Sequence, residues 1–355
     1  MSEQRAPVLT ASMHDLRYFS ALLRGINFTN RATVTVTRQG LTVKVEEART
    51  VTGTAFVFSD VFDEYVYHSE NSDAEGQAQS SQTELDIIAF EVSLNTLIDC
   101  LNIFGTAGLA TSTGGSSNRR WKRPGEGSDH ESGDDHDARA RANRIEPFVG
   151  ASEKHTGMRM TYAGSGYPLT LLIAEDANGP TTTCEIATYE PEPSLDFDFD
   201  NSRMVLKIIL KSSWFRDALS ELDPSYDKLT FISNPPDAVD EATTGRQRRR
   251  NGTKPILRIK AGGNFGSTEM DYPNDRDVLE TFECTRSISF SYRFSHIAKA
   301  LRALQSSTKT SLRIDDEGLL SLQFMMPSSK TRSSEGEGPQ AFIDFQCLAL
   351  DDDVI

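Results

Sequence analysis

The sequence predicts an α+β fold in which two tandem repeats, each an antiparallel sheet with two helices, are joined by an extended connector. Two stretches with apolar residues at helical spacing stand in each half of the chain, and each second-half copy follows its counterpart after about 200 residues. Alternating and β-branched runs surround these helices in both halves. Because few helices accompany many strands, an antiparallel sheet with helices on one face is favoured.

The helices are predicted from their apolar spacing. Residues 13–26 and 212–222 form the first helix of each half, and 93–104 and 295–305 form the second. The apolar positions of the helix at 13–26 are Leu16, Phe19, Leu23 and Ile26. Those of the helix at 212–222 are Phe215, Leu219 and Leu222, which follow a serine that can cap the helix.

The strands are predicted from alternation and β-branching. One short strand precedes the first helix of each half, at 8–12 and at 203–210. The runs between the helices are 32–37, 41–48 and 52–59 in the first half, and 227–233, 255–262, 268–273 and 287–294 in the second. Three strands close each half, at 158–164, 167–175 and 181–188, and at 310–315, 319–326 and 341–350.

Four segments are predicted to be disordered surface insertions, because they are rich in Gly, Ser, Pro or charge and would bury little if they were ordered. They are residues 69–82, about 105–157, 235–254 and 328–339. The sequence therefore divides into a first domain at 1–188, a connector at 189–201 and a second domain at 202–355.

Composition limits the function classes. The net charge of −15 is uneven, since residues 202–313 carry an excess of Lys and Arg that could mark a surface for nucleic acid. The four cysteines form no C-x-x-C pair, which predicts reduced thiols and neither a disulfide framework nor a zinc site. No targeting segment or membrane span is recognised, so we expect a soluble intracellular protein without a membrane partner.

The connector contains the unusual stretch EPEPSLDFDFDNS at 190–202. In an extended chain its acids project from one side and its apolar residues from the other: Asp196, Asp198 and Asp200, and Leu195, Phe197 and Phe199. A calcium loop would need Gly and Glu where Asn201 and Lys207 stand. The pattern therefore favours an interdomain connector over a metal site.

Several local motifs carry a resemblance to a known family: DCLNIFG (99–105), GYPLTLLI (166–173), LDFDF (195–199), FRDALSELD (215–223), FGSTEMDYP (265–273) and DDEGLLSLQFMM (315–326). The chain resembles the Rad-one family, which belongs to the nine-one-one DNA damage checkpoint clamp and to the PCNA-like sliding-clamp superfamily. The resemblance covers almost the whole chain outside the insertions. It implies a DNA-clamp fold and a non-catalytic subunit of a heterotrimeric ring in the nucleus, without a cofactor.

The resemblance also implies partners. They are two homologous subunits of the Rad-nine and Hus-one types, an ATP-driven clamp loader, double-stranded DNA encircled without sequence specificity, and repair and checkpoint proteins. The ring would close through strand edges at 181–188 and 267–273, which include Thr183, Cys184, Glu185, Ile186, Thr268, Glu269, Met270 and Asp271. Client proteins would bind beside Leu195, Phe197, Met325 and Phe342.

Helices line the hole of such a ring, so their basic residues are the candidates for phosphate contacts. These are Arg17, Arg24, Lys211, Arg216, Lys299, Arg302 and Lys309. Ordinary solvated helix charges explain the same residues. Asn95, Asp99 and Asn102 of the second helix would make the lining patchy, which favours sliding over tight binding.

Two other readings stay open. A metal-dependent nuclease needs converging carboxylates, and the His- and Asp-rich segment 128–137 lies in a predicted insertion. A stand-alone β-rich adaptor shares every feature except ring closure. The basic clusters at 118–123 and 246–250 could be nuclear import signals or flexible DNA contacts.

Overall fold

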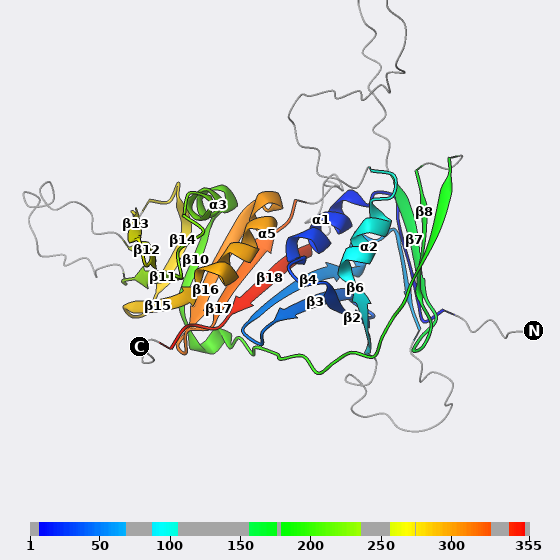
Figure 1. The fold of residues 1–355 in the computed structure, drawn as a ribbon, viewed down its shortest axis with the longest axis horizontal. Helices are drawn as coiled ribbons and strands as arrows, with labels where there is room; N and C mark the ends of the chain where they lie inside the picture. The colour runs from blue at the N-terminus through cyan, green and yellow to red at the C-terminus, as the bar shows by residue number, and fades with distance from the viewer. Residues whose placement is uncertain are drawn as a thin grey trace, which may run out of the picture. The chain divides into compact units, whose positions relative to one another are not determined.

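The two halves of the chain contain the same elements in the same order, as the computed structural model of the protein shows (Figure 1). The structure describes residues 7–68, 87–105, 156–175, 179–235, 256–273, 275–327 and 341–351. The four predicted insertions and both basic clusters fall almost entirely outside these residues. All described residues belong to one contact unit, formed by 1–108 and 155–355, so the predicted division into two domains stays a prediction.

The first half begins with a strand and a helix, continues with five strands and a second helix, and closes with three strands. These elements are β1 (Leu9–Met13), α1 (Arg17–Ile26), β2 (Arg31–Thr37), β3 (Gly40–Glu47), β4 (Val51–Phe58), β5 (Glu64–Tyr67), β6 (Ile88–Ser93), α2 (Leu94–Leu101), β7 (Gly157–Tyr162), β8 (Leu169–Ala174) and β9 (Thr181–Ile186). A 3₁₀ turn, η1 (Ser59–Val61), precedes β5.

The second half repeats this order after the 3₁₀ turn η2 (Asn201–Arg203). Its elements are β10 (Met204–Lys211), α3 (Ser212–Ser220), β11 (Lys228–Ser233), β12 (Leu257–Gly263), β13 (Gly266–Tyr272), β14 (Leu279–Cys284), β15 (Ile288–Arg293), α4 (Phe294–Ile297), η3 (Ala298–Ala300), α5 (Leu301–Ser306), β16 (Lys309–Asp315), β17 (Leu320–Met325) and β18 (Ala341–Cys347).

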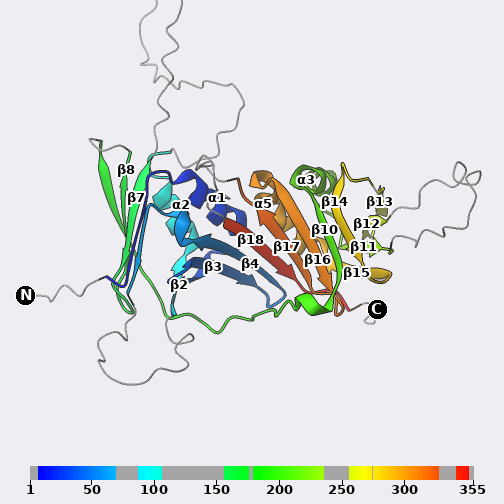
Figure 2. The same ribbon diagram turned by 180° about the vertical axis from the view of Figure 1, so that it is seen from behind.

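The strands form three antiparallel sheets. A five-stranded sheet has the order β5-β1-β7-β8-β9, and a four-stranded sheet has the order β13-β12-β11-β15. The third sheet, β14-β10-β16-β17-β18-β4-β3-β2-β6, takes strands from both halves, which meet where β18 pairs with β4. This pairing joins the two halves through backbone hydrogen bonds, and Figure 2 shows the continuous sheet from behind.

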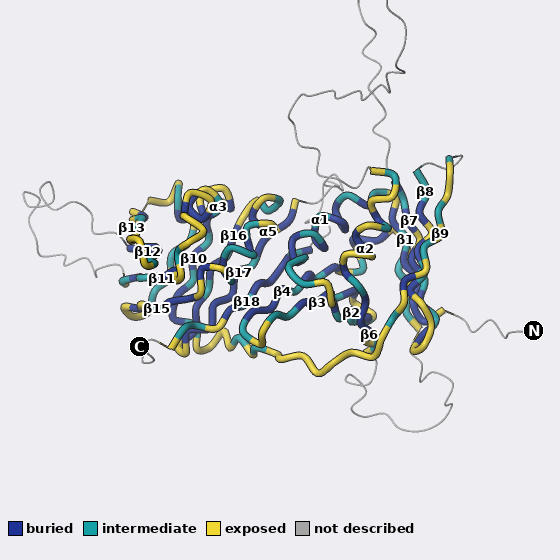
Figure 3. The backbone as a smooth tube through the Cα atoms, viewed as in Figure 1, coloured by how far each residue is buried: buried dark blue, intermediate teal, exposed yellow. Residues whose placement is uncertain are grey.

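The helices pack on one face of the nine-stranded sheet. Helix α1 contacts β3, β4 and β18, helix α3 contacts β10 and β16, and α5 packs against both α1 and α3. The close approach of α1 depends on Gly25, because a Cβ there would clash with Ile343 Cδ1 and lie 3.5 Å from Ala303. One hydrophobic cluster runs through both halves, and Figure 3 shows it as the dark blue interior beneath exposed loops and an exposed connector.

Sequence analysis missed three strands and one interruption of a helix. Strand β5 has only four residues, β6 lies just before a helix, and β14 has a mixed burial pattern, so each gives a weak periodic signal. The helix predicted at 295–305 is a short helix α4, a 3₁₀ turn and a second helix α5. Within the described part of the chain, no helix has the length and apolar character needed to span a membrane.

Candidate functional site: sheet edges, helix face and connector

Strands β9 and β13 are edge strands, as the family resemblance implies. Each stands at one end of its sheet, and no other described strand pairs with its outer side. The predicted residues Thr183, Cys184, Glu185 and Ile186 lie on β9, and Thr268, Glu269, Met270 and Asp271 lie on β13. An unpaired edge presents backbone N–H and C=O groups that a strand of another chain can bind.

The charged side chains of β13 are already paired with its neighbour β12. Arg258 lies 2.6 Å from Asp271 and 3.0 Å from Glu269, and Lys260 lies 3.0 Å from Glu269. The hydrogen bond from Lys260 lowers the pKa of Glu269 below its usual value. These carboxylates are already paired within the sheet. The groups of this edge that remain available to bind another chain are therefore mainly the backbone N–H and C=O groups.

Most of the predicted DNA-facing cations have partners within the chain. Arg17 pairs with Asp15 at 2.8 Å, and Arg216 pairs with its neighbour Asp217 at 2.9 Å. Arg24 lies half-buried in the last turn of α1. The helix face therefore carries positive charge that is partly neutralised, and whether it lies against DNA stays a proposal.

Lys299 and Arg302 join the two halves of the chain. The Lys299 ammonium donates to both carboxylate oxygens of Glu47, at 2.6 and 2.7 Å, and lies 5.4 Å from the centre of the Phe28 ring. Arg302 donates to the carbonyl oxygen of Asn27, where α1 ends. A cation at a helix C-terminus stabilises it, so both side chains have structural roles in this geometry.

Two predicted DNA-facing lysines lie on the other face of the nine-stranded sheet. The Thr310 hydroxyl contacts Ser212 of α3 at 2.8 Å, which places Thr310 toward the helices and its neighbour Lys309 away from them. Lys211 pairs in register with Lys309, and Lys309 lies 2.8 Å from Glu280. Strand alternation thus removes Lys211 and Lys309 from the residues that we propose to face DNA.

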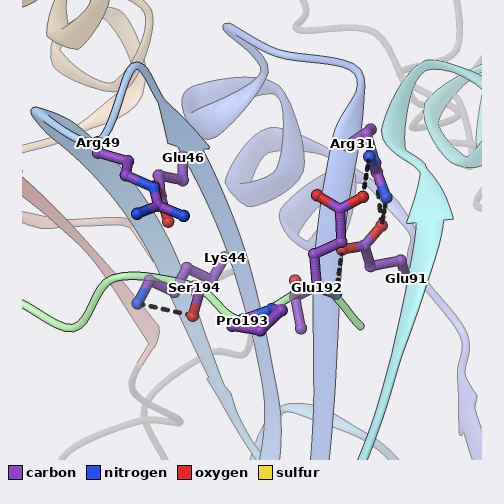
Figure 4. A pocket seen from close by; sticks show the side chains of 9 residues that line it. Arg31, Lys44, Glu46, Arg49, Glu91, Glu192, Pro193 and Ser194 are labelled. Atoms are coloured by element: carbon purple, nitrogen blue, oxygen red, sulfur yellow. Dashed lines mark hydrogen bonds and ion pairs between the residues drawn. The ribbon is translucent and has the colours of Figure 1, made fainter. Parts of the chain in front are cut away.

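The first part of the connector is held by charged groups of β2, β3 and β6 (Figure 4). Arg31 lies 2.5 Å from Glu91 and 2.8 Å from Glu192, and the Glu192 N–H donates to Glu91 at 2.8 Å. The two carboxylates raise the pKa of Arg31, with the hydrogen bond to Glu91 as the main cause. This arrangement fixes the connector where it leaves the first half.

The next turn of the connector is held by β3. Lys44 donates to the Leu195 carbonyl at 2.8 Å and pairs with Asp196, and the Leu195 N–H donates to Glu46 at 2.9 Å. A polar cavity of about 190 Å³ lies between these groups. Its lining residues are Arg31, Thr33, Lys44, Glu46, Arg49, Glu91, Glu192, Pro193 and Ser194. Cations and carboxylates balance in this lining, so it has no net charge that would select an ionic ligand.

The end of the connector lies over a polar network on β16 to β18. The Arg313 guanidinium lies 4.8 Å from the centre of the Phe199 ring and donates to Asn201 at 3.1 Å. Arg313 also donates to Ser321, whose hydroxyl donates to Asp344 at 2.7 Å. Burial lowers the pKa of Arg313 and raises that of Asp344. Sequence analysis did not identify the residues that hold the connector. The acidic residues of the connector were the signal that cationic side chains could bind it.

An apolar patch lies on the nine-stranded sheet. Phe342 stacks on Phe56 with 4.7 Å between ring centres and lies 6.1 Å from Phe58. Met325 is paired with Phe342 in register and is 57% exposed. The structure thus brings two of the predicted partner-binding residues together. Leu195 and Phe197 stay on the connector, where Leu195 is exposed and Phe197 is half-buried.

Among the described residues no group of three or more His, Cys, Asp or Glu side chains could hold a metal ion. The described structure thus presents the edge strands β9 and β13, a partly basic helix face, a fixed connector and an apolar patch.

Comparison with known proteins places this geometry in a family. Residues 8–326 match the family model described as "Repair protein Rad1/Rec1/Rad17". The chain is 31% identical over 339 residues to the mouse "Cell cycle checkpoint protein RAD1", covering 96% of this chain and 91% of the relative. It is 28% identical over 447 residues to the "DNA repair exonuclease REC1" of Mycosarcoma maydis, covering 97% and 96% of the two chains.

The fold has counterparts among solved structures. The proliferating cellular nuclear antigen of Entamoeba histolytica aligns with a TM-score of 0.59 at 11% identity, over 98% of this chain and 100% of that chain. This likeness confirms the predicted clamp fold, and the matched residues cover nearly the whole described structure. The chain therefore belongs to the Rad1/Rec1/Rad17 family of repair and checkpoint proteins and has the PCNA-like sliding-clamp fold.

Proposed function

We propose that the chain is a non-catalytic subunit of a heterotrimeric clamp that encircles double-stranded DNA in the nucleus and supports the DNA damage checkpoint. The three sheets end in six strands, and the observation that carries the proposal is that two of these are β9 in the first half and β13 in the second, the edges at which the resemblance places ring closure. A subunit of a closed ring needs two such edges, one for each neighbour. The partners are homologous subunits of the Rad-nine and Hus-one types, loaded by a dedicated clamp loader.

Repair and checkpoint proteins then dock on the apolar patch of Met325, Phe342, Phe56 and Phe58. The exposed Met325 side chain and the stacked rings offer an anchoring surface for an apolar side chain of a client. A Met325→Asp variant places a charge there and should weaken client binding without changing ring assembly.

A prolyl scan tests ring closure. Along an edge strand, successive N–H groups point alternately to the neighbouring strand and to the open side. Thr182→Pro and Thr183→Pro should therefore differ: one removes an outward donor and blocks assembly with the fold intact, and the other breaks a hydrogen bond to β8. Assembly is measured as co-elution with the two partner subunits in size-exclusion chromatography, with the mass of the complex determined by light scattering. Full assembly of both variants would overturn the edge assignment.

DNA encirclement is tested by topology. A loaded ring should stay on closed circular DNA at high salt and slide off the same DNA after linearisation, whereas a protein that binds by ionic contacts should leave both. Equal loss from circular and linear DNA would contradict the ring.

The second candidate function is a metal-dependent exonuclease, which the name of the Mycosarcoma maydis relative suggests. Such an enzyme holds one or two divalent ions with converging carboxylates. Among the described residues no group of three or more His, Cys, Asp or Glu side chains is arranged in this way. Release of labelled nucleotides by the purified chain with Mg²⁺ or Mn²⁺ would favour the exonuclease instead.

A further inference from the structure

Two of the four cysteines stand on neighbouring, packed elements at the β9 edge. Cys100 stands near the end of helix α2, and Cys184 stands in the middle of β9. The helix packs on this strand, and the neighbouring Cys184 thiol contributes, after burial, to raising the pKa of Cys100 above its ordinary value. Both are free and half-buried, and both pack against the hydrophobic core.

The other two cysteines have different surroundings. The Cys284 thiol donates to the carbonyl oxygen of Arg286 at 3.0 Å, and Cys347 is buried 4.0 Å from His296. Neither has a thiol partner among the described residues. Among the described residues, Cys100 and Cys184 are therefore the pair of cysteines that packed neighbouring elements bring together.

We propose that Cys100 and Cys184 form a redox modification site, at which oxidised glutathione converts the two thiols into a disulfide that fastens α2 to the edge strand β9. One thiolate attacks the glutathione disulfide, forms a mixed disulfide and releases a first glutathione thiol. The second cysteine then attacks the protein sulfur of this mixed disulfide and releases the second glutathione thiol. The two cysteines lose two protons and two electrons, which the two glutathione thiols carry away.

Proximity favours the second step, because the two cysteines stand on packed elements and the reaction is intramolecular. Burial opposes the first step, since it raises the pKa of Cys100 to about 11 and keeps the thiolate scarce near neutral pH. The disulfide should therefore form slowly at neutral pH and faster as the pH rises toward the pKa of Cys100.

The disulfide leaves the edge available. Cys184 points to the core side of β9, as do its neighbours of like parity, Thr182 and Ile186, so the outward backbone groups stay free. The link constrains the unfolded chain between residues 100 and 184 and holds the strand against its helix. That this disulfide would stabilise an edge of a ring rests on the proposed function. The formation of the disulfide between Cys100 and Cys184 does not.

The test uses the full chain in isolation. It is incubated with oxidised glutathione, free thiols are blocked, and peptides are mapped by mass spectrometry without reduction. We expect a Cys100–Cys184 linked peptide as the main product, faster closure at higher pH, and a midpoint of thermal unfolding raised by roughly 5–10 °C.

The controls separate this site from general oxidation. Cys284→Ser should give the same linked peptide, and Cys184→Ser should lose both the peptide and the thermal shift. If the wild-type chain keeps stable mixed disulfides with glutathione at Cys100 or Cys184 and gives no linked peptide, the proposal is overturned. Because no partner subunit is present, the result is independent of ring assembly, which is measured separately with the oxidised chain.

Discussion

Replacing Lys299 by methionine should destabilise the fold without acting through DNA. The Lys299 and Glu47 side chains are only 21% and 35% exposed, and two hydrogen bonds join them across the two halves of the chain. At an effective dielectric constant of about 20, two unit charges at this separation attract by about 4 kcal/mol. Desolvation, side-chain ordering and screening offset most of this attraction and leave about 1 kcal/mol. The contact of the ammonium with Phe28 adds roughly 0.5–1 kcal/mol.

We therefore expect Lys299→Met to lower the free energy of unfolding by about 1–2 kcal/mol, measured by urea denaturation and circular dichroism. A double-mutant cycle with Glu47→Gln should give a coupling energy of about 1 kcal/mol. Lys309→Met is the matched control, because the Lys309 ion pair with Glu280 is more exposed and should be worth about 0–0.5 kcal/mol. Unchanged stability of Lys299→Met together with weaker DNA association would refute this reasoning and restore Lys299 as a phosphate contact.

Three further changes test other parts of the structure. Burial raises the pKa of Asp344, so protonation of Asp344 stabilises the fold at low pH, and this stabilisation is lost as the pH rises through the folded-state pKa. Asp344→Asn should therefore raise the midpoint of urea denaturation at neutral pH and make that midpoint less dependent on pH. Gly25→Ala should cost about 1–2 kcal/mol by overpacking α1 against the sheet, whereas Gly262→Ala, with open space around its Cβ, should be nearly neutral in the same denaturation assay. Arg313→Met should speed amide hydrogen exchange around Phe199 and leave β17 protected, and unchanged exchange would contradict the anchoring role.

Local periodicity explains what the sequence could predict. Leu23 and Ile26 are buried where the helical spacing of 13–26 requires, and the strand predicted at 181–188 is β9, whose edge position was implied by the family resemblance. The duplication was visible because both halves carry the same order of local patterns. Phe197 is half-buried and Asp196 and Asp198 are exposed, as the alternation of the connector predicts.

Non-local pairing explains what the sequence could not predict. Lys299 has the spacing of a solvated helix cation, but its partner Glu47 lies 252 residues away. Nothing in the local pattern at 341–350 indicates that Phe342 pairs with Phe56 of the first half. The role of Arg313 depends likewise on the register of three strands and on the path of the connector.

The charge distribution also bears on how a clamp of this kind would hold DNA. Arg17, Arg216, Lys299 and Arg302 each contact an acid or a carbonyl oxygen of the chain itself, so they release few counterions on meeting phosphate. A surface of this kind grips a duplex weakly and permits sliding. Retention on DNA must then come from closure of the ring at its strand edges. The open edges β9 and β13 are therefore the parts of the molecule on which the proposed function depends most.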